Sequence, residues 1–235
     1  MKISVLVPMY NEGKGVDKFF NSVIPFLKKN YKNWEIIVID DGSVDFTLKN
    51  IKNFSGKDKR ISVISHEKNM GIGAGLRTGL KHVNGNVIIT MDSDLTYDVK
   101  NIPKLLKEMK EKNADVVIGT PFLNKKDHED IPPVRYITSR AGNYIDQLLF
   151  GLNFTTPTSF FRAWKKDAGK NVKITFERFA GVPESAIRLH KMGFKIGEIP
   201  VKYNLRRKSG KIRDIKISIK NTLGHIRMIL SLLMT

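Results

Sequence analysis

Two aspartates one residue apart follow an apolar stretch, because Asp92 and Asp94 come after "VIITM" at residues 87–91. Two carboxylates this close repel each other, and one is pushed toward protonation unless a cation lies between them. Mg²⁺ or Mn²⁺ accepts one or two carboxylates and completes its coordination with substrate phosphates and water. The pair therefore indicates a divalent metal that carries a nucleotide diphosphate. The alternative is a solvated loop whose aspartates cap the next helix.

Two further segments bring polar side chains to the ends of predicted strands. "DDGS" at 40–43 offers carboxylates that accept hydrogen bonds from a base or ribose, although Asp41 or Ser43 could instead cap the next helix. "VPMYNE" at 7–12 places Tyr10 where its ring could cover a flat base. Either segment alone is also typical of an ordinary strand–turn–helix junction.

A glycine-rich segment, "NMGIGAGLRTG" at 69–79, begins like a dinucleotide-binding fingerprint. Leu76 stands where that fingerprint has its last glycine, and the segment follows the third predicted strand instead of the first. This argues against a nicotinamide-dependent oxidoreductase. The segment favours a turn before a helix whose first amides could face an anion.

The elements that position these segments alternate between strand and helix. Continuous apolar stretches are typical of strands that are buried on both faces of a parallel sheet. We expect such strands at 3–8, 34–40, 61–65, 87–92 and 114–119. Helical periodicity is clearest at 16–29 and 101–112. The pattern predicts an α/β fold with a doubly wound, mostly parallel sheet, whose ligands bind at the carboxyl ends of the strands.

After residue 119 the pattern changes to a long polar loop at 120–133, helices near 134–150 and 180–192, and a strand at 195–203. Near the C-terminus, apolar residues recur every three or four positions, at Ile212, Ile215, Ile219, Leu223, Ile226, Leu230 and Leu233. Basic residues flank them, so the stripe predicts either a helix in an anionic membrane interface or a terminal helix packed on the domain.

Composition limits the partners. Lys and Arg total 41 against 23 Asp and Glu, a net charge of +18 that indicates an anionic partner. Basic residues concentrate toward the C-terminus without interleaved aromatics, which argues against nucleic acid. The absence of cysteine excludes disulfides and thiolate metal sites. No signal peptide or spanning apolar run of about 18 residues is recognisable, so we expect a cytoplasmic protein.

Taken in order, V-P-x-Y-N-E, D-D-G-S, N-x-G-x-G-x-G and D-S-D-L resemble the family 2 glycosyltransferases of GT-A fold. Within that family the chain is similar to dolichol-phosphate mannose synthases and polyprenyl-phosphate glycosyltransferases. The resemblance continues through 157–164, 193–203 and 206–213. It implies one GT-A domain over 1–213, with a Rossmann-like nucleotide-sugar and metal half at 1–119 and an acceptor half at 120–213. An amphipathic helix would follow over 214–235.

The resemblance implies a metal-dependent, inverting transfer of mannose or glucose from GDP-mannose or UDP-glucose to a polyprenyl (dolichyl) phosphate. The enzyme would act peripherally on the cytosolic face of a membrane. Asp92 and Asp94 would bind Mg²⁺ or Mn²⁺. The donor-binding residues it implies are Pro8, Tyr10, Glu12, Asp40, Asp41, Ser43, Asn69, Gly71, Gly73 and Asp92. The acceptor-phosphate residues it implies are Arg135, Ser159, Arg207, Lys211 and Arg213. Asp92, Asp94, Arg135 and Arg207 would carry catalysis.

The chain departs from the family pattern at four positions, Thr96, Pro121, Thr156 and Phe160. Three of these lie in the predicted acceptor half, so the donor half matches the family better. The departures leave two alternatives open. One is a family 2 enzyme with a glycan or small-molecule acceptor, and the other is a nucleotide-sugar-binding protein with weak or no catalysis.

Overall fold

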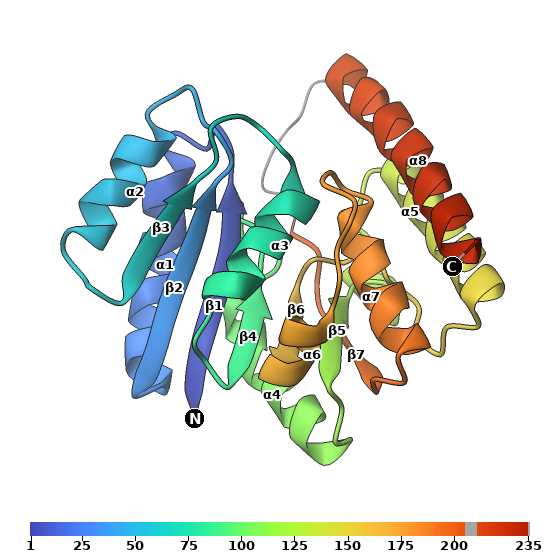
Figure 1. The fold of residues 1–235 in the computed structure, drawn as a ribbon, viewed down its shortest axis with the longest axis horizontal. Helices are drawn as coiled ribbons and strands as arrows, with labels where there is room; N and C mark the ends of the chain where they lie inside the picture. The colour runs from blue at the N-terminus through green and yellow to red at the C-terminus, as the bar shows by residue number, and fades with distance from the viewer. Residues whose placement is uncertain (205–210, 235) are drawn as a thin grey trace.

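The computed structural model describes residues 1–204 and 211–234. Within this part of the chain, seven strands form one sheet in the order β3-β2-β1-β4-β6-β5-β7 (Figure 1). The strands are β1 (Lys2–Met9), β2 (Asn33–Asp40), β3 (Ile61–Ser65), β4 (Val87–Thr90), β5 (Val116–Thr120), β6 (Arg162–Lys165) and β7 (Ile196–Pro200). Only β6 runs antiparallel to its neighbours, β4 and β5. The predicted mostly parallel α/β sheet is confirmed.

Helices cover both faces of this sheet. They are α1 (Gly15–Asn30), α2 (Thr47–Ser55), α3 (Ile72–His82), α4 (Ile102–Glu111), α5 (Pro133–Phe150), α6 (Lys166–Asn171), α7 (Gly181–Lys191) and α8 (Lys211–Leu233). Two short 3₁₀ turns, η1 (Val99–Asn101) and η2 (Lys125–Asp127), occur in loops. In Figure 1, α1 and α4 lie behind the sheet, and α3, α6 and α7 lie in front of it.

The two cores follow from the alternation of side chains along each strand. On β1, Val5 and Val7 point into the core under α1 and α4, whereas Leu6 points into the core under α3 and α7. Because both faces are covered, Val5, Leu6 and Val7 are all apolar and all buried. This is why the central strands correspond to continuous apolar stretches in the sequence.

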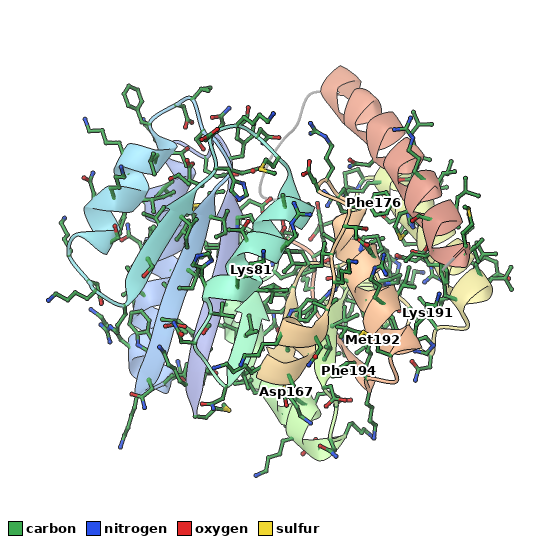
Figure 2. All side chains as sticks on the ribbon, viewed as in Figure 1. Lys81, Asp167, Phe176, Lys191, Met192 and Phe194 are labelled. Atoms are coloured by element: carbon green, nitrogen blue, oxygen red, sulfur yellow. The ribbon has the colours of Figure 1, made fainter. Side chains whose placement is uncertain are left out.

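The last two long helices, α5 and α8, lie side by side beyond α7 (Figure 1). Met228 and Leu232 anchor α8 in the core under α7. Lys191, labelled in Figure 2, donates from Nζ to the Leu232 carbonyl at 3.0 Å. Between the helices, His225 Nε2 contacts both carboxylate oxygens of the buried Asp146 at 2.8 and 2.9 Å.

The structure differs from the sequence expectations at several boundaries. β4 ends at Thr90, so Asp92 lies fully in a loop. Strand β6 and helix α6 were not predicted, since β6 is four residues long and contains a buried arginine. The expected strand at 195–203 is shorter, Ile196–Pro200. The expected boundary between 213 and 214 falls inside α8.

Candidate active site

A pocket of about 270 Å³ opens at the carboxyl ends of β1, β2 and β4. It is lined by Pro8, Met9, Tyr10, Glu12, Asp41, Asn69, Gly71, Ile72, Asp92, Ser93 and Asp94. Most of the residues predicted to bind donor or metal therefore line one cavity. The pairing of the parallel strands explains this, because Met9 aligns with Asp40, and Asp40 aligns with Ser65. The segments that follow these strands consequently emerge together.

Asp92 and Asp94 form the acidic wall of this pocket. Burial raises the pKa of the Asp92 carboxyl to about 7, and the nearby carboxylates of Asp94 and Glu12 add to the shift, while Arg135 opposes it. Asp94 accepts two hydrogen bonds on Oδ1, from the Thr96 backbone N–H at 2.9 Å and the Thr96 hydroxyl at 2.7 Å. The pair is thus a concentration of negative charge that a cation would relieve.

The backbone at this wall is strained, since Leu95 has a φ of +57° although it is not glycine. Its side chain is buried, and its backbone N–H donates to the Asp92 carbonyl at 3.3 Å. The tight turn turns both carboxylates toward the pocket. Strain of this kind is found where a site demands a particular geometry.

The residues present fit a hard divalent cation that keeps water and substrate phosphates as further ligands. Two carboxylates are the usual protein contribution to Mg²⁺ in such sites. Among the described residues, no cluster of three or more His, Cys, Asp or Glu side chains could hold a metal by itself. A cation at Asp92 and Asp94 would therefore need ligands from a bound nucleotide.

Three predicted donor residues do not line the pocket. Ser43 accepts the Asn11 backbone N–H at 3.1 Å, so it shapes the loop at the pocket edge. Asp40 is buried, and its Oδ1 has no hydrogen-bond partner among the described residues. Gly73 is crowded by backbone, because a Cβ there would lie 2.3 Å from the carbonyl oxygen of Phe176, labelled in Figure 2. Their contact with a donor stays a prediction.

On the acceptor side, Arg135 lies close enough to the acidic wall to lower the pKa of Asp92. Its guanidinium donates to the Tyr203 hydroxyl at 2.9 Å and lies over the Tyr203 ring, 5.3 Å from the centroid. Tyr97 packs beside them, stacked on Phe161 at 5.6 Å. The structure thus brings the predicted acceptor arginine next to the predicted metal site.

The other predicted acceptor residues are not placed at the pocket. The Ser159 hydroxyl is buried and donates to the Gly119 carbonyl at 2.7 Å. Arg207 lies outside the described residues, as do the side chains of Lys211 and Arg213. Whether these residues touch an acceptor stays a prediction.

Three of the four positions that depart from the family pattern are integrated into the fold. The Thr156 backbone N–H donates to Glu198 Oε1 at 2.9 Å, and its hydroxyl contacts that of Thr120. The Phe160 carbonyl accepts the Thr90 hydroxyl at 2.6 Å, and its ring is buried in a core. Thr96 orients Asp94, as described above. These side chains therefore have structural partners of their own.

Two polar residues were missed by sequence reasoning. Arg162 is fully buried and joins the loop before β6 to α7, a role for which its apolar neighbours in sequence provide no signal. His66 follows β3 and contacts Asp41 at 2.7 Å. Its position at a strand end, next to the glycine-rich segment, was the signal that could have identified it.

Comparison with known families identifies one match. The model of "Glycosyl transferase family 2" matches residues 4–172. The chain is 30% identical over 229 residues to an uncharacterized protein of Methanocaldococcus jannaschii, with 93% of this chain and 90% of that protein covered. The family match spans every segment that lines the pocket.

Two relatives have names that state an activity. A dodecaprenyl-phosphate galacturonate synthase of Rhizobium johnstonii is 27% identical over 88% of this chain and 60% of its own length. A dolichyl-phosphate beta-glucosyltransferase of Trichomonas vaginalis is 28% identical over 86% of this chain and 65% of its own length. The chain therefore spans less than two thirds of both relatives.

Among solved structures, glucosyl-3-phosphoglycerate synthase from Mycobacterium tuberculosis is similar in fold. Its complex with Mn²⁺, UDP-glucose and phosphoglyceric acid has a TM-score of 0.74 at 18% identity, covering 97% of this chain and 79% of that one. A complex with Mg²⁺ and UDP has a TM-score of 0.71 at 17% identity, covering 98% and 78%. These structures confirm the predicted GT-A type of α/β fold.

Proposed function

We propose that this chain, which belongs to glycosyl transferase family 2, transfers mannose or glucose from a nucleotide-diphosphate sugar to a polyprenyl phosphate. The chain is a glycosyltransferase, and the proposal concerns its metal, donor and acceptor. The observation that carries it is that Asp92 and Asp94 line the same pocket as Tyr10, Glu12 and Asn69. Solved structures of the same fold bind UDP together with Mn²⁺ or Mg²⁺, which supports this donor chemistry.

In this proposal the pocket holds the nucleotide, and Asp92 and Asp94 hold Mg²⁺ or Mn²⁺. When bound, the cation neutralises charge on the leaving diphosphate. Tyr10, whose side chain is 43% exposed at the pocket edge, is available to cover the base. Residues 1–119 form the donor half and residues 120–213 the acceptor half. The role of the protein is chiefly to align donor and acceptor.

In this proposal Arg135 binds the acceptor phosphate beside the acidic wall, since a guanidinium can donate two hydrogen bonds in a fork that matches a phosphate. The acceptor oxygen forms a bond to the anomeric carbon as the bond to the diphosphate breaks, which inverts the configuration. A phosphate oxyanion is already a nucleophile at neutral pH, so no strong general base is required.

A lipid acceptor is supported by an apolar face on α5. This helix buries the polar residues Asn143 and Asp146. It exposes six apolar or aromatic side chains, Val134, Ile137, Tyr144, Ile145, Leu148 and Leu149. The predicted stripe of α8 is also exposed where its side chains are described, at Leu223, Ile226, Leu230 and Leu233. Exposed apolar area of this kind usually marks an interaction site.

The two relatives with stated activities are named for dodecaprenyl and dolichyl phosphate, which supports the same acceptor class. None of the described helices is both long and apolar enough to cross a bilayer. We therefore propose that α5 and α8 dock on the cytosolic face of an anionic membrane without spanning it. A small phosphorylated acceptor is the second candidate, favoured by the burial of Ser159 and by the departures at Thr156 and Phe160.

The donor proposal is tested by thermal unfolding with UDP, GDP or ADP, each with Mn²⁺ or with EDTA. A nucleotide at about 100 times its dissociation constant should add about 2.7 kcal/mol to the free energy of unfolding. We expect one nucleotide to raise Tm only with the metal, which would also identify the base. If no nucleotide raises Tm with Mn²⁺, the donor site is wrong.

The acceptor proposal is tested by co-sedimentation with anionic and neutral vesicles. Leu148→Glu places a charge on the exposed face of α5 and should weaken binding to anionic vesicles. The matched control is Met192→Glu, since Met192 is also apolar, is 52% exposed, and follows α7 outside both helices (Figure 2). Equal binding by both variants would argue against this membrane face. Sugar transfer to glycerol phosphate in preference to polyprenyl phosphate would favour the small-acceptor alternative.

A further inference from the structure

His66 connects three segments at the donor pocket. It follows β3, and its backbone N–H donates to the Asp40 carbonyl at 2.9 Å. Its ring lies between two partners, with Nδ1 2.7 Å from Asp41 Oδ1 and Nε2 2.9 Å from the Thr78 hydroxyl on α3. Only 9% of the His66 side chain and 5% of the Asp41 side chain are exposed. The ring is therefore held in one position.

The Asp41 carboxylate in turn holds the glycine-rich segment. Oδ1 accepts the Met70 backbone N–H at 3.0 Å, and Oδ2 accepts the Gly71 backbone N–H at 2.7 Å. Asp41, Asn69 and Gly71 all line the pocket. One carboxylate thus sets the distance between the two rims of the pocket that follow β2 and β3.

The backbone of the two pocket rims is closely packed and leaves little room for other side chains to hold them together. Gly71 has a φ of +98°, a region that side chains disfavour. At Gly42, φ is +69° and a Cβ would lie 2.4 to 2.7 Å from the backbone of Lys68 and Asn69. The backbone of the rim after β2 therefore packs directly against the backbone of the rim after β3. Their relative position depends on how the Asp41 carboxylate is oriented.

His66 orients that carboxylate. An ionised carboxylate only accepts hydrogen bonds, so Nδ1 carries the proton and donates to Asp41. The Thr78 hydroxyl can donate to Nε2 or accept from it, so α3 supports the ring on the side opposite Asp41. Without the imidazole, Asp41 would keep its two backbone donors but lose the side-chain partner that fixes its rotamer.

We infer that His66 is a positioning residue of the donor site, which acts through Asp41 on the 69–71 rim that contacts the nucleotide. The inference rests on the proposed donor function. His66 itself does not line the pocket, so its effect should appear in nucleotide affinity and donor KM. Turnover at saturating donor should change much less, since the acidic wall is built by a different loop.

The test compares substitutions that keep or lose each ring contact. His66→Ala loses both, His66→Asn keeps an amide donor near the Nδ1 position, and His66→Gln reaches toward Thr78 instead. Thr78→Val removes only the outer contact. The matched control is His82→Ala, because His82 is exposed on α3, the helix of Thr78, and its ring contacts the Thr78 carbonyl at 2.9 Å instead of Asp41.

Dissociation constants for UDP and GDP with Mn²⁺ are measured by calorimetry on the full chain, together with Tm without nucleotide. We expect His66→Ala to weaken binding about tenfold or more, the usual effect of losing a hydrogen bond to a charged group. His66→Asn should restore most of the affinity, His66→Gln little of it, and Thr78→Val should weaken binding about twofold to threefold. The control should bind like the wild type.

If His66→Asn regains nucleotide affinity but not the Tm of the wild type, His66 positions the site and does not act on stability alone. Equal affinity of His66→Ala and wild type would overturn the inference, as would equal weakening by asparagine and glutamine. If His66→Ala does not fold, the comparison of asparagine with glutamine decides. A wild type that binds neither nucleotide would instead overturn the donor function, and the inference with it.

Discussion

The donor and acceptor sides proposed for this enzyme are assembled in different ways. Around the donor pocket, each wall follows a parallel strand, and strand register alone brings Tyr10, Asp41 and Asp92 to one edge. On the proposed acceptor side, Arg135 donates a hydrogen bond to Tyr203, which lies 68 residues further along the chain. Arg135 belongs to the first turn of α5, and Tyr203 to the segment after β7. The donor pocket therefore follows from the general geometry of parallel sheets, whereas the contact of Arg135 with Tyr203 depends on these two side chains.

Side-chain cross-links hold the acceptor half together. Arg162 donates to the carbonyls of Pro157, Ser159 and Val182 at 2.6, 2.6 and 3.1 Å. Glu198 accepts the backbone N–H groups of Thr155 and Thr156. Buried polar groups stabilise only when they are satisfied, so each link is costly to break. This half should therefore be more sensitive to single substitutions away from its surface.

The largest expected effect comes from Arg162→Met. The arginine is fully buried, burial lowers its pKa to about 9, and no ion pair of it occurs among the described residues. Its loss leaves several carbonyls without donors, which should cost about 3 to 5 kcal/mol of unfolding free energy. Urea denaturation measures this, with the exposed Arg227→Met as control. A decrease in unfolding free energy of less than about 1 kcal/mol would show that the acceptor half is not the more sensitive one to such substitutions.

Asp94→Asn tests the donor side without touching the core. The substitution removes one of the two carboxylates at the acidic wall, so metal-dependent nucleotide affinity and sugar transfer should fall about 100-fold or more. The free energy of unfolding should change little. The exposed Asp17→Asn on α1 serves as the control. Retained metal-dependent affinity in the variant would show that Asp94 is not a ligand.

Arg135→Ala separates donor from acceptor. If the guanidinium binds the acceptor phosphate as proposed, kcat/KM for the acceptor should fall about tenfold or more. Donor affinity should change less than about threefold, since Arg135 does not line the donor pocket. The control is Arg140→Ala, five residues further along α5 with its side chain exposed. Equal losses for donor and acceptor would place Arg135 in both sites.

The smallest expected effect concerns a cross-link in the donor half. Glu35 accepts the Ser4 hydroxyl at 2.6 Å and the Asn84 backbone N–H at 2.7 Å, and it pairs with Lys2. Burial alone would raise the pKa of Glu35, but these hydrogen bonds outweigh burial and lower it. Glu35→Gln should reduce the free energy of unfolding at neutral pH by about 1 kcal/mol.

The sign of its pH dependence follows from proton linkage. The lowered pKa means that the folded state binds fewer protons than the unfolded state, so the stabilisation is present above pH 4.5, the ordinary value for glutamate. It is lost as pH falls below that value. Unfolding free energy measured from about pH 6 to pH 3 should therefore decline less steeply in Glu35→Gln. The exposed Glu111→Gln should follow the wild type.

Most of the proposed donor site could be predicted because its signals are local. A continuous apolar stretch followed by polar residues marks a strand end, and parallel strands share an edge. Pro8, Asn69, Gly71 and Asp94 were found in this way, and all line the pocket. Gly73 and Ser43 belong to the same segments, but the structure uses them for packing and for loop geometry. Sequence spacing does not show which member of a segment points inward.

What the sequence alone determined is the alternation of elements, the family, and the edge of the sheet where the donor motifs meet. These depend on period and order along the chain. Only the tertiary structure decided the orientation of α5, which buries Asn143 and Asp146 and exposes apolar residues. The physical reason is that a buried polar side chain needs a partner, and here the Thr158 hydroxyl donates to Asn143 Oδ1 and His225 pairs with Asp146. Asp146 and His225 are 79 residues apart, beyond the reach of any local pattern.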